Sequence, residues 1–216
     1  MFFFPVGCLI LVLFVLFLPF LFLLLFFHVI TFGFEQLGFS PEATILILAL
    51  ILFGSMINIP ITKRKMMRVE RPSFFGFLKK HSLEYQGISV NLGGAVIPVL
   101  ISLFFLAKIP LRPTLIAIGL MTLISYGLAR IIPGRGIVIP AFIPPIFSAL
   151  FAFVLVPEFA ASVSFVSGVL GILIGGDILN LRKARKVSPG MLSIGGAGVF
   201  DGIFLVGIVS VLLTSF

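Results

Sequence analysis

The residues best suited to chemistry are the two aspartates of the chain, Asp177 and Asp201, which lie among glycine and aliphatic residues within 168–207. A charged side chain in a membrane span costs about 2.5 to 3.5 kcal/mol on insertion scales, so it faces the protein interior and suggests a functional site. Two carboxylates in one low-dielectric site cannot both ionise easily, so one holds a proton while the other acts as a base. Such a pair can bind a proton or a cation, or activate water against a peptide bond.

Several neighbouring residues could complete a polar site around the aspartates. Asparagine side chains and the carbonyls of broken helices are suitable ion ligands. Asp177 does not share a face with Gly171 and Gly175 on an ideal helix, so the two aspartates meet only if the helix turns or unwinds, which a glycine pair permits. We therefore expect contacts to a substrate or ion from Asn180, Asn91, Asn58, Gly175, Gly176 and Pro140.

The elements that must position these residues are membrane helices. Hydrophobic residues make up 60% of the chain and charged residues only 10%, whereas soluble domains carry about 25% charged residues. A span needs about 20 apolar residues. The sequence therefore predicts one integral membrane domain over 1–216, an all-α polytopic bundle of about seven spans. We place six spans near 1–30, 43–61, 88–107, 114–132, 160–180 and 193–216, and a fifth in chain order that follows the proline-rich stretch 131–145 and ends near Pro157.

The lysines and arginines give this bundle an orientation. Links on one side of the expected spans hold 7, 2 and 4 of them, a sum of 13, and links on the other side hold 2. The positive-inside rule then places the N-terminus in the cytoplasm. Because the basic residues cluster beside apolar runs, we expect a lipid bilayer, and no nucleic acid, as the partner. The basic, phenylalanine-containing link 62–87 is either a segment on an anionic lipid surface or a solvated loop.

Two further stretches bear on the site. Four prolines and two glycines between 131 and 145 suggest either an irregular or re-entrant element over 133–145 or a loop followed by a proline-kinked helix. The short link 182–190 makes the last two spans neighbours. Helix rise puts both aspartates in the cytoplasmic leaflet. Small-residue pairs that let helix backbones approach closely are Gly171 with Gly175 and Gly198 with Gly202.

The sequence contains no motif that indicates another kind of catalytic or metal site. It contains no HExxH, GxSxG or P-loop motif. With two histidines, His28 and His81, and the single Cys8, we expect neither a metal centre nor a cofactor.

Five segments together resemble a known family of membrane proteins: NIP at 58–60, NLGGAVIP at 91–98, PGRGIVIPA at 133–141, IGGDILNL at 174–181 and GGAGVFDGIFL at 195–205. They are similar to the bacterial and archaeal multi-spanning proteins of domain of unknown function 1614, a resemblance that implies fold and membrane location only. A weaker likeness is to the presenilin-type intramembrane aspartyl proteases. Gly175-Gly176-Asp177, Phe200-Asp201 and Pro140-Ala141-Phe142 resemble their motifs, although Ile174 replaces a glycine and the order of the elements differs.

Three functions follow from these features. Our first expectation is ion- or proton-coupled transport or permeation across the plasma membrane by a multi-pass protein, with a small ion or a membrane-embedded substrate. The alternative is intramembrane aspartyl proteolysis by Asp177 and Asp201. A third is a structural role in which Asp177 pairs with Arg182 or Lys186, and Asp201 bonds to Asn58, Asn91 or Asn180. The sequence does not set the oligomeric state.

Overall fold

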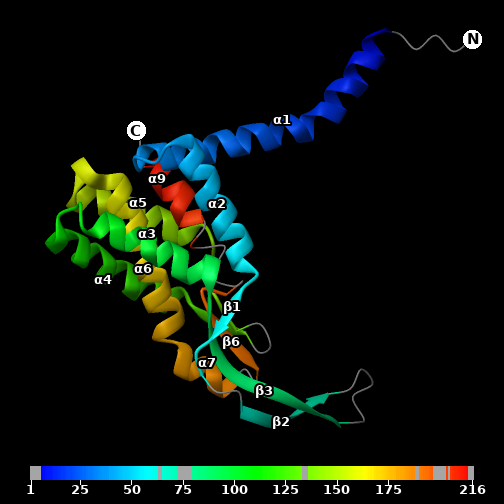
Figure 1. Cartoon of the computed structure of the whole chain (residues 1–216), viewed down its shortest axis with the longest axis vertical. Helices are drawn as coiled ribbons and strands as arrows, with labels where there is room; N and C mark the ends of the chain where they lie inside the picture. The colour runs from blue at the N-terminus through cyan, green and yellow to red at the C-terminus, as the bar shows by residue number, and fades with distance from the viewer. Residues whose placement is uncertain are drawn as a thin grey trace, which may run out of the picture.

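The structure, a computed structural model, describes residues 6–62, 65–72, 79–132, 136–187, 190–196, 203 and 205–213. Most of these residues are helical, as expected (Figure 1). The helices are α1 (Val6–Gln36), α2 (Pro41–Ser55), the π-helix η1 (Leu92–Val96), α3 (Ile97–Leu106), α4 (Leu111–Leu128), α5 (Ile143–Leu155), the 3₁₀ helix η2 (Pro157–Phe159), α6 (Ala160–Ile172), the π-helix η3 (Leu173–Ile178), α7 (Leu181–Val187), the π-helix η4 (Val206–Ser210) and α9 (Val211–Leu213).

The helix α6 is the centre of the molecule. It packs against α3, α4, α5, η4 and α9, and most of its side chains are buried. The helix then continues directly into η3. Since α6 also contacts the last two helical segments, the prediction that the helix carrying Asp177 and the C-terminal helix are neighbours is confirmed.

Three helices in the described part of the chain are long and apolar enough to cross a membrane. They cover Leu13–Glu35, Leu111–Leu128 and Pro157–Ile178, whereas the apolar helices Pro41–Ser55, Leu92–Leu106 and Ile143–Leu155 are shorter. The protein is thus a membrane protein. The expected helices are present in order, but three helices of full length do not establish seven spans.

The first helix stands apart from this bundle. Figure 1 shows the N-terminal part of α1 extending away from the other helices, and its side chains from Leu13 to Leu25 are exposed. An apolar helix whose surface is exposed needs lipid or another apolar partner around it. Among the described side chains, the C-terminal end of α1 joins the core through Phe34, and Leu37 joins it just after the helix ends.

The all-α prediction needs correction, because two small sheets lie at one end of the bundle (Figure 1). One contains β1 (Asn58–Pro60), β2 (Lys65–Pro72), β3 (Lys79–Asn91) and β6 (Met191–Ile194); the other contains β4 (Arg130–Ile132) and β5 (Gly136–Val138). β3 pairs antiparallel with β1 and β2 and parallel with β6. The basic link 62–87, which we expected to be a lipid-surface segment or a solvated loop, contains β2 and most of β3, which pair with one another.

These strands also shorten the expected spans. Helix α2 ends at Ser55 instead of 61, helical structure after the basic link begins at Leu92 instead of 88, and α4 ends at Leu128 instead of 132. The expected last span begins with strand β6. Hydropathy misplaced these boundaries because the residues concerned, such as Ile88, Val90 and Ile131, are β-branched and apolar, and they fit a strand as well as a membrane helix.

The proline-rich stretch contains strand structure that neither of the two expectations included. β4 and β5 pair antiparallel, and β5 lies within the stretch. Pro140 follows β5 and is half-buried, and α5 begins at Ile143 with two prolines in its first turn. Proline is accommodated in a first helical turn because the N–H it lacks would have no intrahelical partner.

Candidate functional site: a buried carboxylate on a π-helix

Asp177 lies on η3 with only 1% of its surface exposed. Its Oδ2 atom accepts a hydrogen bond of 2.5 Å from the backbone N–H of Gly195, in the turn after β6. Gly195 has a φ of +68°, and a Cβ atom there would lie 2.6 Å from the Gly94 carbonyl. Only glycine fits this left-handed, crowded position. The carboxylate thus contacts a backbone amide that the fold holds in place.

The helix that carries Asp177 is wound more loosely than an α-helix. Leu179 N–H donates to Ile174 O, five residues back, and Asn180 Nδ2 donates to the Gly175 carbonyl at 3.0 Å. The glycine pair Gly175-Gly176 permits a departure from the ideal helix, and η3 spans both residues. π-bulges of this kind frequently occur at functional sites.

The adjacent glycines Gly175 and Gly176 face different neighbours. A Cβ atom at Gly175 would collide with the Thr122 carbonyl of α4, and one at Gly171 would collide with Met121. The close approach that these glycines predicted is therefore real, but the partner is α4 and not the C-terminal helix. Gly176 instead lies against Ile139, just after β5.

The asparagines form two separate groups. Asn91 Nδ2 donates to Ser55 O at 2.6 Å and to Asn58 Oδ1 at 3.2 Å, and Asn91 Oδ1 accepts from Gly94 N. Ser193 Oγ donates to the same Asn58 oxygen at 2.5 Å. These contacts join α2, β1, β3 and β6. Asn180 belongs instead to η3.

Two polar side chains lie close in sequence or contact to the turn that bonds to Asp177. The exposed Asn58 accepts from Ser193 Oγ on β6, two residues before Gly195. The Ser193 carbonyl accepts from Gly196 N at 3.1 Å, and the adjacent Gly195 N–H bonds to Asp177. Sequence reasoning selected the asparagines but missed Ser193 and Gly195, because nothing in the sequence showed that β6 would pair with β3.

One buried hydroxyl near this segment has no partner in the described part of the chain. Ser125 on α4 is fully buried, and its Oγ atom forms no hydrogen bond there. Its Cβ atom would lie 3.0 Å from a Cβ added at Gly175. A buried polar group without a partner is unusual in a protein interior, so α4 places a spare donor and acceptor against η3.

The second aspartate of the predicted pair, Asp201, lies outside the described residues, so the pairing stays a prediction. Neither Arg182 nor Lys186 pairs with Asp177, whose carboxylate takes its bond from Gly195. Pro140 lies two residues after the end of β5, and the residue before it, Ile139, lies beside Gly176.

In the part of the chain that the structure describes, no three His, Cys, Asp or Glu side chains gather where they could hold a metal ion.

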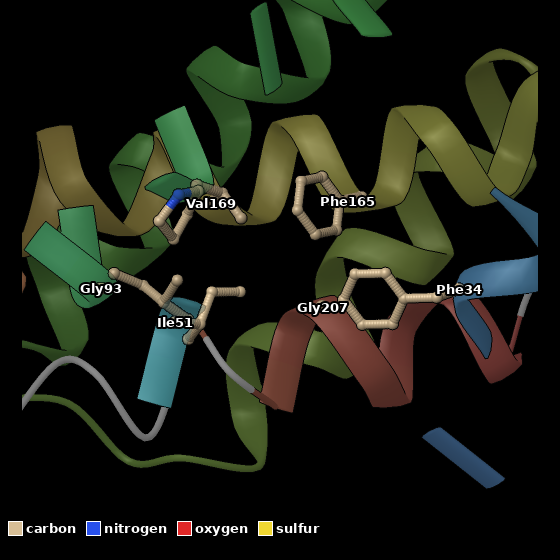
Figure 2. Close-up of a pocket in the computed structure, with 8 residues that line it drawn as sticks. Phe34, Ile51, Gly93, Phe165, Val169 and Gly207 are labelled. Atoms are coloured by element: carbon tan, nitrogen blue, oxygen red, sulfur yellow. The ribbon is translucent and has the colours of Figure 1, made fainter. Parts of the chain in front are cut away.

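A small cavity further along α6 is a different kind of space. Figure 2 shows Phe165 and Val169 of α6 on one side of it, with Phe34 and Gly207 opposite. Its volume is about 20 Å³, room for about one water molecule. Because its lining is apolar, we interpret it as a packing gap. The polar site is confined to the η3 end of the helix.

Comparison with known proteins places the chain in a family. A family model described as a protein of unknown function, DUF1614, matches residues 52–213. The chain belongs to this family. DUF1614 thus covers every described residue of the site, from Asn58 to Gly195, and begins after the end of α1.

The other comparisons add no relative. No curated protein and no solved structure matches the chain. The resemblance to DUF1614 that the sequence motifs suggested is confirmed. The weaker likeness to presenilin-type proteases finds no support.

Proposed function

We propose that Asp177 binds a proton or a small cation, and that this binding serves ion- or proton-coupled transport or permeation across the membrane. The observation that carries the proposal is a carboxylate buried in a helix of membrane-spanning length, bonded to one backbone amide and to no cationic side chain of the described residues. Burying an unpaired charge is costly, and such residues in membrane segments usually mark ion or proton pathways.

The surroundings of Asp177 support reversible binding. The Gly195 N–H can donate to the carboxylate whether or not its other oxygen carries a proton. The loosened winding of η3 and the turn at Gly195 supply irregular backbone near the charge, the arrangement that discontinuous helices use to hold ions. The turn that bonds to Asp177 also follows Ser193, whose Oγ donates to the exposed Asn58.

The proposal includes an orientation. We infer a multi-pass protein of the plasma membrane with a cytoplasmic N-terminus, because the basic residues of β2, β3 and α7 lie at the end of the bundle that carries the sheets. By the positive-inside rule this end faces the cytoplasm. Asp177 would then lie near the cytoplasmic end of its helix, about 26 Å from Ala160 at 1.5 Å per residue.

The test is ion flux through purified protein in liposomes. We expect the wild type to carry protons or one of the alkali cations, and Asp177→Asn to abolish that flux, because asparagine preserves size but cannot hold a proton or balance a cation. Glu158→Gln is the matched control, since it also removes one carboxylate but from an exposed link. Equal flux through the wild type and Asp177→Asn for every ion tested would contradict the proposal.

A second candidate role rests on the bond to Gly195 itself. Asp177 could act as a clamp that holds the turn after β6 against η3, with no ion bound. Asparagine retains an oxygen that can accept from Gly195, whereas alanine does not. If a clamp is its only role, Asp177→Asn behaves like the wild type in every assay and Asp177→Ala is less stable. Cleavage of a helical substrate that Asp177→Ala and Asp201→Ala each abolish would instead establish aspartyl proteolysis.

A further inference from the structure

An open apolar groove lies next to the polar site and is separate from it. The groove has a volume of about 400 Å³ and lies between α3 with η1 on one side and α6 with η3 on the other, with β3 and β6 at its end. All its lining residues are alanine, valine, leucine or isoleucine. Leu100 and Ile178 are two of them, exposed by 60% and 50%. A groove lined in this way offers water no hydrogen-bond partner, and it suits a flexible hydrocarbon chain.

One end of the groove leads to a cluster of positive charge. Ile174 and Ile178 of η3 line it, and α7 follows two residues after η3 with the sequence LRKARKV. Leu179 keeps helical angles, φ −68° and ψ −30°, and Ala184 N donates to Asn180 O, so the helical path continues. α7 also contacts β6, whose Ile194 lines the groove.

The spacing aligns two of these cations with the groove. Ile174, Ile178, Arg182 and Lys186 follow one another at intervals of four residues across η3, a two-residue turn and α7. Within an α-helix such as α7, residues four apart are neighbours on the surface. Lys183 faces another way, since its Nζ atom donates to Tyr126 Oη of α4 at 2.7 Å. Arg182 and Lys186 therefore continue the apolar stripe of η3 as a cationic one.

We propose that this groove binds one acyl chain of an anionic phospholipid, whose phosphate lies on Arg182 and Lys186. The combination of aliphatic groove and adjacent cations selects an anionic lipid of the bilayer over a zwitterionic one. Arginine binds phosphate oxygens through two parallel hydrogen bonds, and lysine acts as a point charge. Basic surfaces beside membrane helices commonly bind anionic head groups. The site is independent of any ion at Asp177.

The test uses the absence of tryptophan from the chain. In Leu100→Trp the single indole lies in the groove, and in the matched control Leu123→Trp it lies on the exposed surface of α4, where the native leucine is 69% exposed. The protein is reconstituted in bilayers that contain either phosphatidylglycerol or phosphatidylcholine with brominated acyl chains, which quench tryptophan on contact. Ile178→Trp is a second groove position, in case Leu100→Trp does not fold.

We expect brominated phosphatidylglycerol to quench the groove tryptophan at lower mole fraction than phosphatidylcholine, and both lipids to quench Leu123→Trp alike. Each cation near a membrane surface favours an anionic lipid by about fivefold. Arg182→Gln with Lys186→Gln should remove the preference. Lys108→Gln, between α3 and α4, with Arg112→Gln, in the first turn of α4, should preserve it. Equal quenching by both lipids at Leu100 and Ile178, or a preference that survives the change at Arg182 and Lys186, would overturn the proposal.

Discussion

At the scale of single residues, the site depends on one carboxylate and one backbone amide. Asp177 is the residue that the sequence marked most clearly, because a charge among glycines and aliphatics is expensive. Its partner Gly195 is 18 residues away, and the contact forms only because β6 brings the turn back to η3. The structure thus shows a site in which charge comes from one helix and its hydrogen-bond donor from a strand end.

The contact between Asp177 and Gly195 leads to a stability prediction. We expect Asp177→Ala to lower the free energy of unfolding by about 1–3 kcal/mol, because the buried Gly195 N–H loses its acceptor. Asp177→Asn should lose much less, since its amide oxygen replaces the carboxylate oxygen. Thermal unfolding in detergent, monitored as the loss of monodisperse protein, measures the stability of both variants. Equal destabilisation by the two variants would show that the charge, and not the hydrogen bond, holds this region together.

At the scale of elements, the central contact is that between η3 and α4. Gly171 and Gly175 let the two helices approach until their backbones touch. The sequence predicted close approach from this glycine pair, and the approach is present; loosened winding at Gly175-Gly176, which the glycine pair permits, is present as well. It named the wrong partner helix, because a small-residue pattern shows which face packs closely but not which neighbour packs on it.

The glycines give an element-scale prediction. Gly175→Ala should destabilise the protein by about 1–3 kcal/mol, because the new methyl group collides with the Thr122 carbonyl, and backbone atoms cannot move aside. Gly119→Ala on α4 is the control, since no atom lies within 4 Å of its added Cβ. That change should be neutral or stabilise by up to about 1 kcal/mol. Thermal unfolding of both variants is the measurement. If Gly175→Ala is as stable as Gly119→Ala, Gly175 does not pack closely against α4.

The strands show where sequence reasoning at this scale stops. The apolar helices were placed in the right order from composition alone. Strands β1 and β4, the end of β3 from Ile88 and part of β6 were absorbed into expected spans, because apolar residues such as Ile59, Ile88 and Ile131 fit a strand as well as a helix. The parallel pairing of β3 with β6 joins residues about a hundred positions apart. No local pattern specifies such a pairing, so the donors that β6 brings to the site could not be foreseen.

At the scale of the whole molecule, basic and acidic residues are unevenly placed. α7 carries four cations and lies with the sheets, and Glu158 lies in η2 at the opposite end of α6. The segment Pro157–Ile178 between them is long enough to span a bilayer. The fold therefore separates a basic end, which holds Asp177 and the sheets, from an end with an acidic residue.

This arrangement predicts the side of the membrane that each end faces. In a Cys8→Ser background, a cysteine at Lys186 should react with a membrane-impermeant thiol reagent only after the cells are opened. A cysteine at Glu158 should react in intact cells. Labelling of both positions from the same side would mean that Pro157–Ile178 does not cross the membrane.

The measurement that tests the central claim most directly is ion binding to the purified protein. The wild type, Asp177→Asn and Glu158→Gln would be titrated with alkali cations while bound cation and released protons are counted. We expect the wild type and Glu158→Gln to bind a proton or one cation, and Asp177→Asn to bind neither at this site. Binding in Asp177→Asn that equals binding in the wild type would show that Asp177 is not the site.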